Sequence, residues 1–397
     1  MINEGVKTMK RSVITKLCLS LALGTPIIAS AADSSSSSGL GELQKQMDRI
    51  FFVSPNGTCG ATTAIARPIL ENDCNQCCTS WFLQLSILYW KTRVNGTDFA
   101  YTVGNSTAQF PISGRLKEME FDWDWGLKLG LGYNLPHDGW DMFLGYTWLD
   151  THASKRIGAA RNNAVVPDQG NSSISNLPDG YFAYCSKGKS QLDFVLNTLD
   201  FEMGRYYYVS EHLALRPQFG AKAGWLKLAQ VIRYTGGVPG AANLPTGLDV
   251  NTVRVKGRSE FFGIGPRAGA YTNWHICNCF SLFGNVTTAL LYGNFDVLHK
   301  NDYSRLKCLN AIKLVDKFHA FIPNLEFQIG VQFDRYFNED MNHARVQINL
   351  DSQYFWRVNQ MLRANQLLSL GSPVANYSHI SEDLGMYGIT ATFRLDF

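Results

Sequence analysis

A strict two-residue alternation between Phe121 and Tyr133 constrains the fold of this chain more than any other feature. The even positions of this segment carry Asp122, Asp124, Lys128 and glycines, whereas every odd position is apolar or aromatic: Phe121, Trp123, Trp125, Leu127, Leu129, Leu131 and Tyr133. Successive side chains of a β-strand point to opposite faces, so a period of two indicates a strand. A helix would scatter the charges among the aromatic residues, and the helical interpretation is therefore rejected.

The same alternation recurs at 213–225, 325–334, 345–351 and 387–397, and in each segment the charged residues share one parity. Two environments fit this pattern. In a soluble sandwich the apolar parity is the core and the charged parity faces water. In a transmembrane barrel the apolar parity faces lipid, because a Lys or Arg in the mid-bilayer costs about 2–4 kcal/mol.

Composition and the last strand favour the membrane interpretation. Charged residues are 17% of the chain and aromatic residues 13%, whereas charged residues are about 25% of average soluble domains. No stretch after the N-terminal leader approaches the ~20 apolar residues that a membrane helix needs. The strand ending in Phe397 is expected to be paired, because an open sheet edge in lipid is forbidden. The fold class is therefore predicted to be an all-β, antiparallel transmembrane β-barrel, with a secreted all-β protein as the alternative.

About ten strands are expected, with about twelve to sixteen as the alternative count. The ten are 80–92, 117–134, 139–152, 190–209, 212–234, 252–274, 278–297, 319–336, 343–357 and 384–397. The connections alternate between short ones, expected to be periplasmic turns, and long outer loops at 93–116, 153–189, 235–251, 298–318 and 358–383. Apolar residues at mixed three-to-four spacing predict helices within 303–318 and 358–368, and 40–50 is expected to be a short periplasmic helix.

The N-terminal region has the pattern of an export signal. Basic residues, an apolar stretch from Leu17 to Ile28 and the small residues Ala29-Ser30-Ala31 predict a signal peptide at 1–31. A Ser-rich and Cys-rich periplasmic segment is expected at 32–79, followed by the barrel at 80–397.

Eight cysteines follow the predicted signal peptide and are expected to be oxidised in an exported protein. The disulfide candidates are Cys59, Cys74, Cys77, Cys78, Cys185, Cys277, Cys279 and Cys308. The predicted topology allows pairing only within one side of the membrane. Bridges are therefore predicted between the Cys74/Cys77/Cys78 cluster and Cys277 or Cys279, and between Cys185 and Cys308, and an interchain bridge remains an alternative. A zinc site at Cys74-x-x-Cys77 is disfavoured, because no second pair of ligands lies at metal spacing.

The chain resembles the major outer membrane porins of Legionella and of chlamydia-like bacteria. The residues that carry the resemblance are Trp81-Phe82-Leu83-Gln84-Leu85-Ser86-Ile87-Leu88-Tyr89-Trp90 after a Cys-rich lead, Gly139-Trp140-Asp141-Met142-Phe143-Leu144-Gly145-Tyr146-Thr147 after a short turn, and the last strand ending in Phe397. The resemblance implies an abundant barrel porin of the bacterial outer membrane, with disulfides that strengthen the envelope or join subunits.

A barrel of this kind predicts passive diffusion of small hydrophilic solutes and ions through a weakly selective lumen. The pore-lining candidates are six acids and six bases: Asp122, Asp124, Glu326, Asp334, Asp351, Asp396, Lys128, Arg216, Lys222, Arg267, Arg345 and Arg394. The alternatives are a surface adhesin, or a structural barrel with little conductance in which the same charges pair and fill the lumen.

Motifs for other chemistry are not found. The sequence contains no phosphate-binding loop, no His-Glu-x-x-His pattern and no nucleophile elbow, so no enzyme activity, metal or cofactor is expected. The net charge of +3 gives no argument for a nucleic-acid partner. The expected partners are outer-membrane lipid, small solutes, and further copies of the chain as a homo-oligomer.

Overall fold

The computed structural model describes residues 80–104, 114–135, 139–158, 163–169, 172–173, 181–182, 185–210, 212–236, 252–276, 279–303, 308–337, 342–369 and 372–397, all within one compact unit, Ile50–Phe397. The predicted signal peptide, the Cys-rich segment and the predicted helix at 40–50 lie outside the described residues. Within these ranges, no helix has the length and apolar character needed to cross a membrane.

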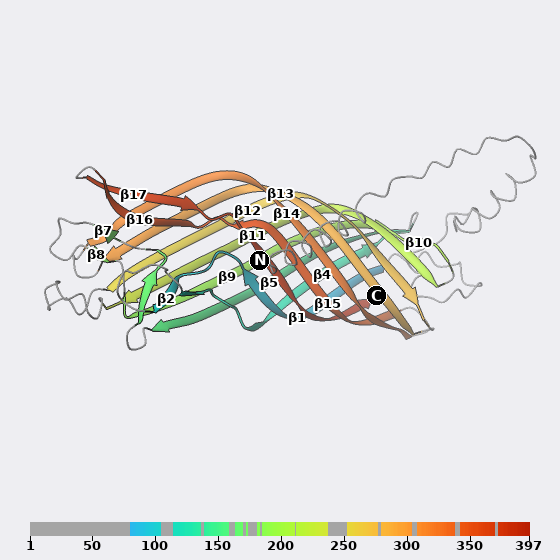
Figure 1. Cartoon of the computed structure of the whole chain (residues 1–397). Coiled ribbons are helices and arrows are strands. Elements are labelled where there is room, and N and C mark those ends of the chain that lie inside the picture. The colour runs from blue at the N-terminus through green and yellow to red at the C-terminus, as the bar shows by residue number, and fades with distance from the viewer. Residues whose placement is uncertain are drawn as a thin grey trace, which may run out of the picture. The chain divides into compact units, whose positions relative to one another are not determined.

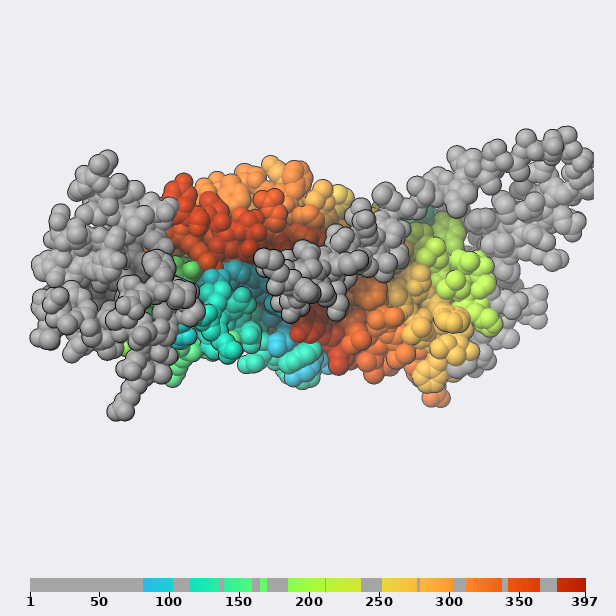
Figure 2. Space-filling view, in the orientation of Figure 1, coloured from blue at the N-terminus to red at the C-terminus, as the bar shows by residue number. Residues whose placement is uncertain are grey.

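Ten long antiparallel strands form a closed barrel (Figure 1). They are β1 (Ser80–Val94), β4 (Trp123–Asn134), β5 (Trp140–Gly158), β9 (Lys187–Arg205), β11 (Leu213–Thr235), β12 (Thr252–His275), β13 (Phe280–Tyr303), β14 (Cys308–Phe337), β15 (Asn342–Asn359) and β18 (Glu382–Asp396). Strand β18 pairs with both β15 and β1, and β11 pairs with both β9 and β12, so the sheet has no open edge among these strands. Figure 2 shows the red C-terminal strand beside the blue and cyan strands of the N-terminal half.

The predicted fold class is confirmed, and each of the ten predicted strands coincides with one strand of the barrel. The first and last strands begin and end at the same end of the barrel, where the backbone of Trp81 and Phe397 exchange two hydrogen bonds of 3.1 and 2.9 Å. We call this end, which carries the short turns and is predicted to be periplasmic, the turn end. The opposite end, predicted to face outward, is the loop end.

The two helices predicted in the long loops are wrong. Within 303–318, Tyr303 is the last residue of β13 and residues 308–318 belong to β14. Within 358–368, β15 ends at Asn359 and β16 (Leu362–Ser369) follows. Antiparallel β16 pairs with β17 (Ser372–His379). Short apolar segments are ambiguous between the two periods, and here the pairing with neighbouring strands decides the outcome. Most of the connection expected at 298–318 is therefore strand, because β13 extends to Tyr303 and β14 begins at Cys308.

Further short strands lie at the loop end (Figure 1). β2 (Ala100–Gly104) pairs with β3 (Gly114–Lys117) and with β6 (Asn163–Pro167). The pairing of β2 with β6 joins the connection after β1 to the connection after β5. β7 (Ser172–Ser173) pairs with β8 (Tyr181–Phe182) and with β16. At the turn end, β10 (Tyr207–Tyr208) pairs with β11.

The outward face of the barrel carries an apolar band bounded by aromatic side chains. On β1 the exposed residues Leu83, Leu85 and Ile87 lie between Trp81 and Tyr89. The ring of Trp81 contacts that of Tyr133, with centroids 4.8 Å apart, and Tyr89 contacts Trp125 at 4.7 Å. These contacts mark the two edges of the band, as aromatic girdles do in outer-membrane barrels. Trp125 is 65% and Leu350 is 60% exposed. An apolar band of this kind is favourable when it contacts hydrocarbon and unfavourable when it contacts water.

Candidate functional site in the barrel lumen

The inward face of the strands changes character from one end of the barrel to the other. On β1, Gln84 and Ser86 point inward near the turn end, whereas Leu88 and Trp90 point inward nearer the loop end and are 1% and 2% exposed. The other strands follow the same order, because antiparallel neighbours place their polar inward residues beside those of β1. The lumen therefore has a mainly polar half at the turn end and a mainly apolar half at the loop end, where buried polar side chains such as Gln230 and His299 are interspersed.

A buried ionic network fills the middle of the barrel. Its centre is Lys222 on β11, whose side chain is 0% exposed. The Lys222 Nζ donates to Asp200 Oδ1 at 2.8 Å and to Glu326 Oε1 at 2.5 Å. Arg267 on β12 donates to the other Glu326 oxygen at 2.9 Å and also pairs with Glu202. Burial of charges at this depth is tolerated because each one is paired and hydrogen-bonded.

Arg216 extends this network toward the turn end. Its Nε donates to Asp141 Oδ2 at 2.8 Å, and its guanidinium lies 3.7 Å from Glu202. Five strands, β5, β9, β11, β12 and β14, are thus connected across the lumen by side chains of opposite charge.

A second ionic cluster lies at the turn end. Arg345 on β15 donates to Asp334 Oδ1 on β14 at 2.8 Å, and His343 Nε2 lies 2.9 Å from the same oxygen. Arg394 donates to Asp396 at 2.7 Å, and His343 also contacts Asp396. The guanidinium of Arg394 lies 3.6 Å from the ring centroid of Phe82, a cation–π contact.

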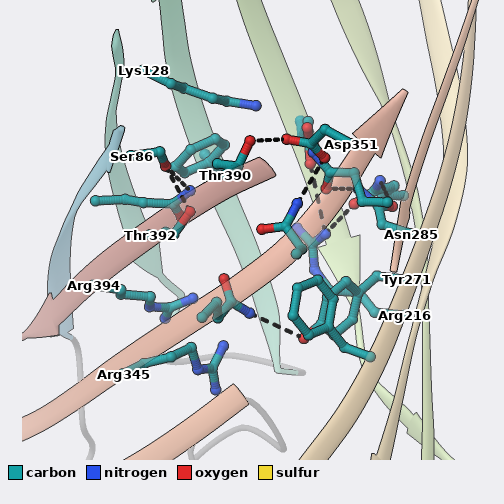
Figure 3. Close-up of a pocket in the computed structure, with 18 of the residues that line it drawn as sticks. Ser86, Lys128, Arg216, Tyr271, Asn285, Arg345, Asp351, Thr390, Thr392 and Arg394 are labelled. Carbon is teal, nitrogen blue, oxygen red and sulfur yellow. Dashed lines mark hydrogen bonds and ion pairs between the residues drawn. The ribbon is translucent and has the colours of Figure 1, made fainter. Parts of the chain in front are cut away.

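A polar cavity of about 120 Å³ lies between these clusters (Figure 3), a volume that holds several water molecules. Amide side chains form much of its wall, including Gln84, Gln218, Asn285, Gln328 and Gln347. Lys128 extends into it from β4 on the side of Thr390 and Asp351, which are hydrogen-bonded to each other (Figure 3). Such a site can hold water and small neutral polar solutes.

The loop-end half of the lumen is closed by apolar side chains. Leu149, Leu192, Leu196 and Phe295 come from three strands and are 0% exposed. They belong to one continuous cluster that also includes residues of the first outer connection, among them Phe99, Ala100, Met119 and Phe121. Side chains that fill a narrow barrel in this way make a packed core rather than a channel.

The first outer connection enters this core between residues 95 and 100. Gln230 Nε2 donates to the carbonyl of Thr97 at 3.1 Å, and the Tyr234 hydroxyl donates to the carbonyl of Phe99. Asn359 Nδ2 donates to the carbonyl of Asn95 at 2.8 Å. The backbone polar groups of this segment are thereby satisfied inside the barrel, as burial requires.

An ion-pair bridge at the loop end ties three connections together. Arg363 on β16 lies 2.6 Å from Asp98 and 2.8 Å from Asp168, which follows β6. Burial raises the pKa of the Asp168 carboxyl; Arg363 opposes this shift and Asp98 adds to it. The bridge holds the 95–100 segment against the β16–β17 hairpin.

The structure places the sequence-predicted lumen residues as follows. Inward and buried are Arg216, Lys222, Arg267, Glu326, Asp334, Arg345 and Asp351, while Asp124, Lys128, Arg394 and Asp396 point inward and are half-buried. Asp122 is different: it precedes β4 and is exposed, whereas its neighbour Phe121 is buried in the core, because the alternation begins only at Trp123. Except for Asp124, these inward residues lie in the ionic clusters or in the cavity wall. Their role as pore lining stays a prediction.

Sequence reasoning missed several interior residues. Asp141, Asp200, Glu202 and His343 complete the ionic clusters. A signal was present, because Asp200 and Glu202 alternate with the outward residues Leu199 and Phe201. The apolar side chains that fill the loop-end half of the lumen were missed for another reason. There the alternation is inverted: on β9 Leu192 and Leu196 point inward while Asp193 points outward, so the rule that apolar residues face lipid assigns the wrong face.

The cysteines fall partly outside the described residues, namely Cys59, Cys74, Cys77, Cys78 and Cys277. Cys185 is a free, fully buried thiol whose backbone pairs with that of Val165, and Cys279 is a free, exposed thiol in the turn after β12. This differs from the predicted Cys185–Cys308 bridge, because Cys185 is enclosed in the apolar core at the loop end. It also differs from a bridge to Cys279. Burial raises the pKa of the Cys185 thiol to about 12.

No group of three or more His, Cys, Asp or Glu side chains in the described ranges is arranged to hold a metal ion. The buried carboxylates of Glu326 and Asp334 are paired with Lys and Arg side chains.

These features define an outer-membrane β-barrel with a filled lumen. Residues 75–397 match the family model described as Legionella pneumophila major outer membrane protein precursor, and the chain belongs to that family. The predicted family and the predicted location in the bacterial outer membrane are both confirmed. A search of curated proteins found no match.

Solved structures with a similar arrangement include the outer membrane protease OmpT from Escherichia coli, at 11% identity over 81% of this chain and 99% of that chain, with a TM-score of 0.37. The toluene transporter TbuX from Ralstonia pickettii is 10% identical over 80% of this chain and 88% of that chain, with a TM-score of 0.27. The toluene transporter TodX from Pseudomonas putida is 11% identical, over 80% and 89%, with a TM-score of 0.26. These TM-scores are too low to bear on the activity of this chain.

Proposed function

We propose that this protein is a structural outer-membrane barrel whose lumen is closed to solutes in its resting state. The single observation that supports this proposal is the continuous apolar cluster that crosses the lumen at the loop end and includes Phe99 and Ala100 of the inserted segment. Ions do not cross a dry apolar layer, because an unpaired charge there loses its hydration without compensation. The paired charges below it are better suited to holding strands together than to attracting ions.

Passive diffusion of small hydrophilic solutes is the second candidate, and two observations favour it. A polar cavity with amide walls already occupies the turn-end half. The segment that closes the loop-end half is held by a few polar contacts from Gln230, Asn359 and Arg363. A channel would open if this segment left the lumen and the apolar side chains around it separated.

Conductance in planar lipid bilayers distinguishes the two functions. The barrel is purified in its folded form, verified by its heat-dependent gel mobility, and compared with Arg363→Ala/Gln230→Ala, which loosens the inserted segment. Silent bilayers for the wild type support the closed barrel. Stepwise conductance from the wild type contradicts it and establishes the diffusion channel, and conductance from the variant alone assigns the closure to the segment.

We also propose that disulfides of the Cys-rich segment reinforce the envelope. Support comes from the turn end, where Cys279 exposes a free thiol. Gel electrophoresis with and without reductant tests this role. A high-mass ladder that collapses on reduction supports interchain bridges, and an unchanged monomer band in both lanes rejects them.

A further inference from the structure

Two rows of cations cross the outward face of the barrel at the loop end. In one row, Lys256, Lys300 and Lys313 are direct cross-strand partners on β12, β13 and β14. In the next row, direct partners on β5, β9, β11 and β12 are Arg156, Lys189, Arg233 and Arg254. We call these seven residues the basic belt. All of them are exposed or half-buried and alternate with buried inward residues such as Val255 and Val297.

The described residues leave most of the basic belt without an ion-pair partner. Among the residues in these two rows that the structure describes, the single acid is Asp302, which lies 3.7 Å from Lys256. No described residue forms an ion pair with five members of the belt: Arg156, Lys189, Arg233, Lys300 and Lys313. The Nε of Arg254 is a buried donor without a hydrogen-bond partner in the described structure. Like charges directly opposite each other destabilise a sheet, so this arrangement needs an external anion to be favourable.

The rows nearer the membrane have the opposite character. Lys227 lies 3.3 Å from Glu260, and Lys317 lies 3.0 Å from Asp296. Arg258 lies 3.8 Å from Asp296 as well. Charge is therefore balanced just beyond the girdle, and the positive excess begins only further out.

The height of the belt selects the kind of anion. Lys256 and Lys313 lie about six and eight residues beyond the exposed aromatics Phe262 and Phe321 of their own strands. At about 3.3 Å per residue and a tilt of about 40°, this places the belt roughly 15–20 Å beyond the hydrocarbon. The headgroups of phospholipids extend only about 5–8 Å beyond it. A longer anionic headgroup is required.

We propose that the basic belt binds the anionic oligosaccharide of an outer-leaflet glycolipid, through phosphate and carboxylate groups on its core sugars. Arg156, Arg233 and Arg254 offer planar guanidinium groups that bind such oxyanions in bidentate fashion, and the lysine row adds point charges. The acyl chains of the same glycolipid then lie against the apolar band, so one molecule contacts both the basic belt and the apolar band on the outward face. Bound glycolipid relieves the repulsion within the belt.

The test uses the folded barrel in detergent and compares the wild type with Lys256→Gln/Lys300→Gln/Lys313→Gln. The matched control is Lys91→Gln/Arg93→Gln/Arg357→Gln, which removes the same charge from the loop end of β1 and β15. The probe is rough-type lipopolysaccharide with its core sugars, followed by native mass spectrometry and by titration. Each lysine near an anionic surface contributes about fivefold, so the belt variant is expected to lose roughly a hundredfold in affinity, and the control less than about threefold.

Four results would overturn the proposal: equal affinities of wild type and belt variant, equal losses in belt variant and control, equal binding of lipid A without core sugars, or displacement of the probe by millimolar inorganic phosphate or a sulfated polysaccharide. The belt variant should fold, because it removes like-charge repulsion. A Lys256→Arg/Lys300→Arg/Lys313→Arg variant should retain the affinity. If the triple Gln variant does not fold, Lys300→Gln alone carries the test, with an expected loss of several-fold.

Discussion

Replacing Lys222 with Met tests whether the ionic network in the lumen holds the barrel together. The ammonium is 0% exposed and bridges Asp200 and Glu326, whose side chains are only 2% and 4% exposed. Met keeps the length of the side chain and removes the charge, which leaves two buried carboxylates with Arg267 as their remaining cation. Removing one partner of a buried pair costs about 3–5 kcal/mol, and Arg267 keeps the expected loss near about 3 kcal/mol.

The matched control is Lys227→Met, on the same strand. Lys227 pairs with Glu260 at 3.3 Å, but the side chains are 55% and 35% exposed, so its loss should cost about 0–1 kcal/mol. The free energy of unfolding is measured by reversible urea titration in phospholipid vesicles, followed by tryptophan fluorescence. A double-mutant cycle with Asp200→Asn should give a coupling of about 1.5 kcal/mol or more. The reasoning is refuted if Lys222→Met costs no more than Lys227→Met, or if the two lumen substitutions are additive.

Three further predictions concern packing, thiol reactivity and pH. Gly293→Ala should destabilise the barrel by about 1–3 kcal/mol, because a Cβ there would lie 2.0 Å from the backbone oxygen of Phe262, whereas Gly158→Ala meets nothing within 4 Å and should be neutral in the same urea titration. Maleimide should label exposed Cys279 within minutes and Cys185 only after unfolding, because Cys185 is buried and its thiol pKa is raised to about 12; rapid labelling at Cys185 in the folded barrel, located by peptide mass spectrometry, would contradict the burial. Burial raises the pKa of Asp168, so this carboxyl favours folding below about pH 4 and loses that contribution as the pH rises through its folded pKa. Asp168→Asn should therefore raise the melting temperature relative to wild type at pH 7, and the difference should vanish below about pH 4; a difference independent of pH would contradict the assignment.

The barrel itself was predictable because lipid imposes a simple rule on its outward face. Leu83, Leu85 and Ile87 alternate with smaller or polar residues, and a charge on the lipid side is costly at any of these positions. The same rule located Lys222, Arg267 and Glu326 on the inward parity. It did not identify their partners Asp200 and Glu202, since pairing across the lumen depends on which strands face each other after closure.

The loop end was not predictable by the same reasoning. Leu192, Phe194 and Leu196 are buried within the barrel, whereas the outward parity beside them carries Gln191 and Asp193. The polarity of the two faces is therefore the reverse of that within the membrane, and the lipid rule assigns them wrongly. The hairpin of β13 and β14 was expected to contain a helix, because the apolar spacing of 303–318 fits both periods over a short length. Its pairing with neighbouring strands decided for a strand.

The amino-acid sequence by itself thus determined which residues face lipid, because hydrocarbon acts on each residue separately and leaves a local pattern of period two. Only the tertiary structure decided whether the lumen is open. That outcome depends on contacts between residues far apart in the chain, such as Gln230 with Thr97 and Lys222 with Glu326. The geometry of closure brings these residues together, and no local pattern records it.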